Sequence, residues 1–184
     1  MNNLAKMVFV VALKTALGVG IAALLCAGAR AQATGSTPVP VKPEQGVVTQ
    51  KTLSLAMAKT IAESALAACQ ALGYHTAVAV VDRAGQVLVI LRDEQATSQM
   101  AEMARRKAYT ARMYRMTTAE FEKRTAEPNY AAQRDLADVL ALGGGAPIKV
   151  GNDTVGAVGS AGSTQEKDDS CAKAGIAKVA ELLK

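Results

Sequence analysis

The amino-acid sequence predicts one α+β domain with a mainly antiparallel sheet. Two pairs of β-rich runs are each joined by a short polar connection, which predicts two hairpins. Segments with apolar residues at helical spacing lie before, between and after these hairpins. The predicted order is helix, strand, strand, helix, helix, strand, strand, helix.

Residues 1–31 have the composition of a cleaved export signal. Two lysines precede an apolar run over 16–27, and Ala29-Arg30-Ala31 forms an A-x-A cleavage site. We expect cleavage after Ala31 or Ala33 and a periplasmic or secreted protein. The apolar run is shorter than the about 20 residues that a bilayer requires, so we expect no stable membrane anchor.

The basic character of the chain is concentrated in this signal. The whole chain has 21 Lys and Arg against 16 Asp and Glu, a net charge of +5. Lys6, Lys14 and Arg30 lie in residues 1–31, which contain no acid, so 18 cations and 16 acids remain, a net charge of +2. Nucleic-acid binding requires a strongly basic face, so we do not expect nucleic acid as a partner.

The N-terminal half of the domain begins after a predicted flexible linker over residues 32–51, which is rich in Gly, Ser and Pro. The domain is predicted to span 52–184, with a first helix over 53–72. Residues 76–81 and 86–91 form the first predicted hairpin. Both runs are apolar at nearly every position, so we expect both sheet faces to be covered, with a second subunit as a candidate cover for one face.

The C-terminal half contains the other helices and the second hairpin. A helix is predicted over 97–114, and the capping-box pattern of 117–120 opens a short one after it. Residues 125–145 are less regular. Residues 148–150 and 154–158 form the second predicted hairpin, and 163–166 caps a final helix that runs to Lys184.

Two cysteines, Cys69 and Cys171, remain after removal of the signal, and each lies on an apolar helical face. In an oxidising compartment they can form one disulfide. Two buried free thiols are the alternative, and geometry decides between them.

The common motifs of nucleotide binding and hydrolysis are missing. The Gly143-Gly144-Gly145 run lacks the Lys and Ser or Thr of a P-loop. Gly156, Gly159 and Gly162 do not match the dinucleotide fingerprint, so we expect them to allow close approach of a strand and a turn into the last helix. His75 is the only histidine, and no G-x-S-x-G elbow accompanies it.

Acidic side chains gather in the first turn of the final predicted helix. Glu166, Asp168 and Asp169 lie there, where negative charge is favourable beside the helix dipole. We prefer this interpretation to a metal site.

The stretch from Ala104 to Ala111 concentrates three cations and two hydroxyls: Arg105, Arg106, Lys107, Tyr109 and Thr110. Adjacent helical residues point in different directions, so at most two of the cations share a face with a hydroxyl. One interpretation is a solvated basic face with a packed tyrosine. The other is the edge of a pocket, where Arg106 or Lys107 pairs with a carboxylate and a hydroxyl provides an oxygen.

The chain resembles the GlcG/HbpS family of small heme-binding and related domains. Five blocks carry the resemblance, in the family's order: 80–85 (VVDRAG), 105–111 (RRKAYTA), 143–148 (GGGAPI), 155–162 (VGAVGSAG) and 167–176 (KDDSCAKAGI). The resemblance implies an α+β domain with a five-stranded sheet flanked by helices, assembled into homo-oligomers. It also implies heme binding and, in some members, an accessory role in heme or redox sensing with a sensor protein as partner.

The resemblance also implies site residues. Thr110 is the candidate oxygen ligand of the iron, with Tyr109 as the alternative, and Arg106 and Lys107 would hold the heme propionates. Many relatives place a histidine eight residues before the motif's lysine, where this chain has Gln99. Imidazole binds iron far better than an amide does. His75 can replace the missing histidine only if the loop before the first predicted strand reaches the pocket.

We therefore predict an exported heme-binding protein, with Met100 and Met103 as apolar contacts of the heme, and binding rather than catalysis. The first alternative is an enzyme or carrier for a small organic acid of the glycolate type. In that case Arg106 or Lys107 clamps a carboxylate and Tyr109 acts as general acid. The second alternative is an oligomeric protein with no small ligand.

Overall fold

The computed structural model describes residues 46–184. The predicted signal and most of the predicted linker, which fall within 1–45, lie outside the described residues. Residues 47–54 contain no helix or strand, and the first helix begins at Leu55. Among the helices of the described part, none combines the length and the apolar character needed to cross a membrane.

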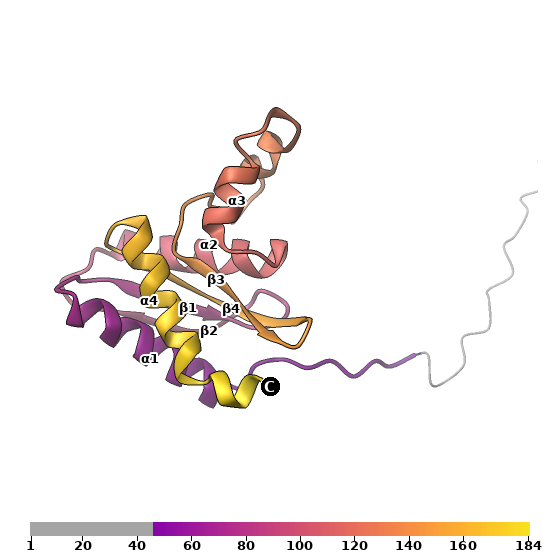
Figure 1. Ribbon diagram of the computed structural model, residues 1–184, viewed down its shortest axis with the longest axis horizontal. Helices are drawn as coiled ribbons and strands as arrows, with labels where there is room; N and C mark the ends of the chain where they lie inside the picture. Colours follow the sequence, from indigo (N-terminus) through magenta and orange to yellow (C-terminus); the bar gives the residue numbers. More distant parts are fainter. Residues whose placement is uncertain (1–45) are drawn as a thin grey trace, which may run out of the picture. The chain divides into compact units, whose positions relative to one another are not determined.

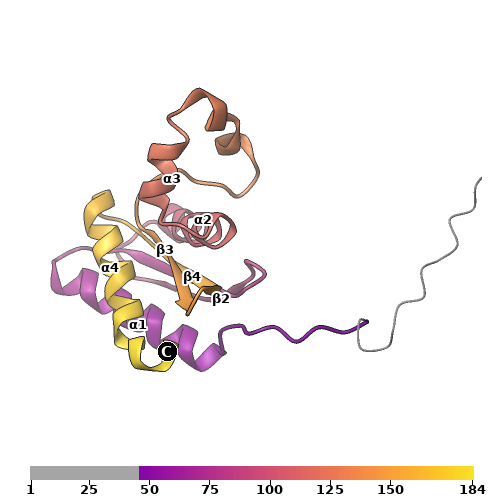
Figure 2. The same ribbon diagram turned by 45° about the vertical axis from the view of Figure 1, so that its right-hand side comes forward.

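A four-stranded antiparallel sheet lies between two helical layers, as Figure 1 shows. The strand order is β2-β1-β4-β3. Helices α1 and α4 lie side by side on one face, and α2 covers the other (Figures 1 and 2). The elements are α1 (Leu55–Ala71), β1 (Ala77–Val81), β2 (Val87–Arg92), α2 (Ser98–Tyr114), α3 (Thr118–Arg124), β3 (Gly145–Val150), β4 (Asp153–Ala161) and α4 (Gln165–Lys178), with 3₁₀ turns at Pro128–Asp135 and Ala180–Leu183.

Strand β1 shows how the core is divided between the two faces of the sheet. Val78 and Val80 pack with α1 and α4, whereas Ala77, Ala79 and Val81 pack with α2. All five side chains are fully buried, as expected from a strand that is apolar at every position. The prediction of two covered faces is confirmed for β1 but was wrong for β2, an edge strand on which Val87 and Ile90 are exposed. At β1 the second cover is α2 of the same chain rather than a second subunit.

The predicted fold class and order of elements are confirmed, with two corrections. The sheet has four strands instead of the five implied by the resemblance. The final helix ends at Lys178 and gives way to a 3₁₀ turn before Lys184. The predicted capping box at 117–120 is present, since Thr117 Oγ1 accepts from Glu120 N and the Glu120 side chain accepts from Thr117 N. At 163–166 the cap differs from the prediction, because Thr164 rather than Ser163 caps α4 and accepts from Lys167 N.

The second hairpin is longer than predicted at both strands. Strand β3 already begins at Gly145, and β4 continues to Ala161. Glycine and Pro147 weaken the strand signal in the sequence. However, β3 is an edge strand, where a proline without an N–H donor is tolerated.

Gly159 in β4 sets the distance between the sheet and α2. A Cβ atom at this position would lie 2.2 Å from Ala104 O and 2.6 Å from Ala108 N. Both are backbone atoms of α2 and have no rotamer with which to move away. The glycine is therefore needed for close approach of a strand to a neighbour, as the sequence predicts.

We expect Gly159→Ala to lower the free energy of unfolding by about 3 kcal/mol, because α2 must separate from the sheet. Urea unfolding followed by circular dichroism measures this loss. The control is Gly151→Ala in the β3–β4 turn, where an added Cβ meets nothing within 4 Å and only the positive φ of 59° opposes it. That cost is about 1 kcal/mol. Equal losses in the two variants would contradict the role of Gly159.

The disulfide alternative is settled by the geometry of α1 and α4. Cys69 and Cys171 form a disulfide that joins the two helices, with their Cα atoms 5.5 Å apart. The bond connects positions 102 residues apart in the sequence. It therefore ties the first helix of the domain to the last one.

Candidate functional site

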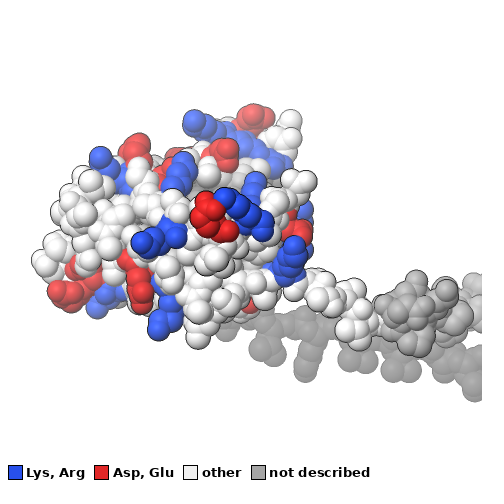
Figure 3. All heavy atoms as spheres, turned by 60° about the horizontal axis from the view of Figure 1, so that its bottom comes forward, with Lys and Arg blue, Asp and Glu red and all other residues white. Residues whose placement is uncertain are grey.

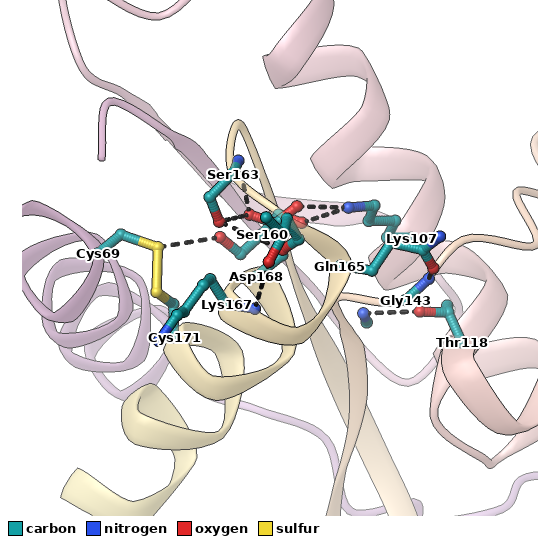
Figure 4. A network of polar contacts seen from close by, with 12 residues as sticks. Cys69, Lys107, Thr118, Gly143, Ser160, Ser163, Gln165, Lys167, Asp168 and Cys171 are labelled. Atoms are coloured by element: carbon teal, nitrogen blue, oxygen red, sulfur yellow. Dashed lines mark hydrogen bonds and ion pairs between the residues drawn. A yellow bond between two sulfur atoms is a disulfide. The ribbon is translucent and has the colours of Figure 1, made fainter. Parts of the chain in front are cut away.

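Lys107 lies at the centre of a buried polar network between α2 and α4, which Figure 4 shows. Its Nζ donates to Asp168 Oδ2 at 2.8 Å and to Ser160 O at 2.9 Å. The Lys107 side chain is 2% exposed and that of Asp168 3%. A buried ion pair is tolerated only when further hydrogen bonds satisfy the remaining polar atoms, and this one meets that condition.

The second oxygen of Asp168 holds the turn before α4. Oδ1 accepts from Ser163 N at 3.1 Å and from Ser163 Oγ at 2.7 Å. Asp168 lies in the first turn of α4, as predicted, and its carboxylate is in addition buried against the Lys107 ammonium. The sequence did not reveal this partner, which is 61 residues away along the chain.

The run from Gly143 to Gly145 passes directly over this ion pair. A Cβ atom at Gly144 would lie 2.7 Å from both Ser160 O and Asp168 Cβ, and φ is 119°, so only glycine fits there. Gly145 N donates to Thr118 Oγ1 at 2.8 Å, and Gly143 N donates to the side chain of Gln165. The glycine run thus closes over Lys107, with α3 and α4 holding it in place (Figure 4).

The disulfide lies next to the same network (Figure 4). Cys69 Sγ is 3.7 Å from Ser160 Oγ, and the carbonyl of Ser160 accepts from Lys107. Cys171 follows Asp168 by about one turn of α4. The cross-link therefore supports the elements that carry the acceptors of Lys107.

A cavity of about 330 Å³ opens beside this network. Its lining includes the apolar side chains of Met100 and Met103 of α2 and of Leu142. The polar residues Lys107, Asp168 and Ser163 also line it. An apolar cavity with a few convergent polar groups is the usual form of a small-molecule site.

Arg106 and Thr110 lie against the segment before β3 and are not among the residues that line this cavity. Thr110 Oγ1 accepts from Leu140 N and donates to Arg106 O, both at 2.8 Å. Arg106 Nη2 donates to Val139 O at 2.6 Å. Together these bonds fasten residues 139–140 to α2.

The other candidates from the sequence lie apart. Tyr109 packs with Met113 against Gly85 of the β1–β2 turn. Gln99 is exposed in the first turn of α2, four residues before Met103, so the two share a helical face. Arg105 pairs with Glu102 and Asp138.

His75 precedes β1 and is not among the residues that line the cavity, although its carbonyl oxygen lies against Gly162, which does line it. Its Nδ1 is 3.0 Å from Asp93 Oδ1. The pKa of Asp93 lies below its ordinary value because Gln70 and the Gln95 backbone donate hydrogen bonds to it, with a smaller contribution from His75. The imidazole is therefore engaged by a carboxylate at this position.

Of the sequence candidates, the structure brings only Lys107, Met100 and Met103 together at the cavity. No cluster of three His, Cys, Asp or Glu suited to a metal ion occurs in residues 46–184. Acidic and basic side chains are interspersed over the face in Figure 3, and neither sign dominates it.

Comparison with known proteins gives consistent matches. Residues 53–177 match the family described as "Haem degrading protein HbpS-like". The chain is also 30% identical over 135 residues to an uncharacterized 15.0 kDa protein in the dhaT-dhaS intergenic region of Citrobacter freundii. That match covers 71% of this chain and 94% of the relative.

Solved structures share the fold. A double mutant of Streptomyces reticuli HbpS is similar with a TM-score of 0.70 and 34% identity, over 77% of this chain and 96% of that one. PduOC, solved as a complex with heme, has a TM-score of 0.62 and 25% identity, over 68% of this chain and 94% of its own.

Proposed function

Since the chain belongs to the HbpS-like family, we propose that it is an exported heme-binding protein that uses the cavity beside α2. The cavity carries this proposal, because it combines the apolar side chains of Met100, Met103 and Leu142 with a charged wall. PduOC, which shares the fold, was solved with heme. An apolar wall suits the porphyrin face, and charged groups suit its propionates.

The size of the cavity bears on how heme would fit. Its volume of about 330 Å³ is near the lower end of the range for small-molecule sites. It therefore accepts part of a porphyrin, and the remainder lies at the surface or against a second copy of the chain. If the remainder of the heme lies against a second copy, the protein binds heme as a homo-oligomer, and we propose this arrangement.

The residues present supply an iron ligand of a known type. Methionine thioethers serve as axial ligands of heme iron in other proteins, and those of Met100 and Met103 line the cavity. Thr110 fulfils the role implied by the family resemblance only if iron replaces a hydrogen-bond partner of its hydroxyl. For Tyr109 to bind the iron, its side chain would first have to lose its packing against Gly85.

The propionates require cations that retain free donors. Lys107 is engaged by Asp168 and Ser160, so a propionate would have to compete with a buried carboxylate. Arg106 donates through Nη2 to Val139 O, and its guanidinium has further N–H donors. Because Arg106 does not line the cavity, we propose it as the propionate partner for the part of the heme that extends outside the cavity, with Gln99 on the same helical face as Met103.

Export is supported by two independent observations. The sequence of residues 1–31 has the pattern of a cleaved signal, and the folded domain contains a disulfide, which persists in oxidising compartments. Because Cys171 lies about one turn from Asp168 at the cavity, we also propose an accessory role in heme or redox sensing. Fractionation of the host cell with mass spectrometry of the mature N-terminus tests export: cytosolic, uncleaved protein would contradict it.

Titration of the mature protein with hemin tests binding directly. We expect a saturable change in the Soret band with a fixed ratio of heme to subunit. A change that only grows with free hemin, without saturation, would remove the proposal. Light scattering of the apo and heme-loaded protein then shows whether the heme-binding unit contains more than one chain.

We expect Met100→Leu combined with Met103→Leu to remove a thioether ligand while conserving most of the side-chain volume. Hemin affinity should fall by about tenfold or more, and the spectrum of the bound heme should lose its thioether signature. The matched control is Met113→Leu, on the same helix but packed against Gly85. If the double variant retains the wild-type spectrum, the two methionines are not iron ligands.

A further inference from the structure

A second cavity, of about 470 Å³, lies where the β1–β2 turn meets the C-terminal half of α2. Arg83 of the turn and Arg112 of α2 both line it. Gln50 and Thr52, just before α1, complete one side. The cavity is distinct from the one beside Lys107, because Met100 and Arg112 are separated along α2 by roughly 18 Å at 1.5 Å per residue.

One hydrogen-bond donor of Arg112 is buried without an acceptor. Its Nε atom is buried and has no hydrogen-bond partner within the described residues. The pKa of Arg112 lies below its ordinary value, first because burial disfavours the charge and then because Arg83 and Arg115 repel it, with a smaller opposing attraction from Asp82. A buried donor on a repelled cation is a costly arrangement unless an anion accompanies it.

Arg83 is only loosely engaged. Its Nη1 donates to Lys51 O at 3.3 Å, and its Nη2 lies 3.7 Å from Asp153 Oδ1. The Asp153 side chain is 58% exposed, so this pair contributes little to holding the guanidinium. Two arginines therefore line one cavity, with Asp82 as the acid among its lining residues.

Asp82, the acid in the cavity wall, has another role. Its Oδ1 accepts from Ala84 N at 2.8 Å and from Gln86 N at 2.9 Å, which shapes the β1–β2 turn. These bonds place Arg83 next to the cavity. Asp82 also attracts Arg112, but this attraction is smaller than the repulsion from the neighbouring arginines, and it gives Arg112 Nε no hydrogen-bond partner.

We propose that the cavity binds a small oxyanion, a phosphate or carboxylate group, between the guanidinium groups of Arg83 and Arg112. Two oxygens of such a group match the parallel N–H donors of a guanidinium, and burial strengthens the bonds. The anion gives Arg112 Nε a partner and offsets the repulsion between the cations. This site is separate from the proposed heme site, and neither depends on the other.

Calorimetric titration of the mature protein with inorganic phosphate, and separately with glycolate and malonate, tests the site and distinguishes its two sources of oxyanion. We expect one saturable site for at least one of these probes, with affinity that falls as salt is added. Arg112→Gln should weaken binding by about tenfold or more. Arg112→Lys should recover only part of it, because a lysine keeps the charge but loses the planar fork.

The charge-matched control is Lys59→Gln, an exposed position on α1 that removes one positive charge elsewhere. It should bind the probe as the wild type does. The proposal is overturned if none of the three anions binds, or if Arg83→Gln and Arg112→Gln bind as tightly as this control. Circular dichroism of each variant confirms that loss of binding is not loss of folding.

Discussion

Replacing Asp168 by alanine is expected to lower the free energy of unfolding by about 3–5 kcal/mol. The substitution leaves the ammonium of Lys107 buried with Ser160 O as its remaining acceptor. It also removes the acceptor of the Ser163 N–H and O–H groups. Chemical denaturation of wild type and variant at the same pH measures the difference, provided that both unfold in one transition.

The neighbouring residue offers the control for this prediction. Asp169 pairs with Lys173, whose side chain is 58% exposed, so Asp169→Ala should cost less than about 1 kcal/mol. Lys107→Met combined with Asp168→Leu removes both charges and should recover much of the loss. If Asp168→Ala costs no more than Asp169→Ala, the Lys107 ammonium is not held by Asp168.

Loss of the disulfide is the second large expected effect. Removing it through Cys69→Ala and Cys171→Ala should lower the free energy of unfolding by about 2–5 kcal/mol. The bond closes a loop between positions 102 apart. For about 100 residues the chain-entropy model gives about 4.7 kcal/mol at 25 °C.

Reduction provides the control for this second prediction, because Cys26 lies in the predicted signal and the variant domain has no thiol left. Dithiothreitol should therefore destabilise the wild-type domain and leave the double variant unchanged. A wild-type melting temperature that does not respond to the reductant would contradict the expected stabilisation.

Local signals in the sequence predicted most elements correctly. The apolar spacing of 53–72 and the Thr117 and Glu120 pattern each depend on neighbours a few residues apart, which is why helix and cap were both found. The ends of the strands were harder to predict than their positions in the chain. Gly145 and Pro147 weaken a local strand signal, and only pairing with β4 makes them part of β3.

The candidate site was predicted only in part. The Ala104 to Ala111 stretch was identified from its composition, and Lys107 does lie at the centre of a buried network. Which of its side chains points toward the site was not predictable, because a helix places Arg106, Lys107 and Tyr109 on different faces. Which face meets a cavity depends on how α2 packs against β4, and that is decided by Gly159.

The amino-acid sequence by itself determined the α+β class, the two hairpins, the capping box of α3 and the family, because these follow from spacing and local chemistry. The tertiary structure alone decided that Lys107 pairs with Asp168, that Cys69 bonds to Cys171, and that Arg83 and Arg112 share a cavity. Each of these pairs joins residues far apart in the chain. Their contact is a property of how the layers pack, which no local pattern encodes.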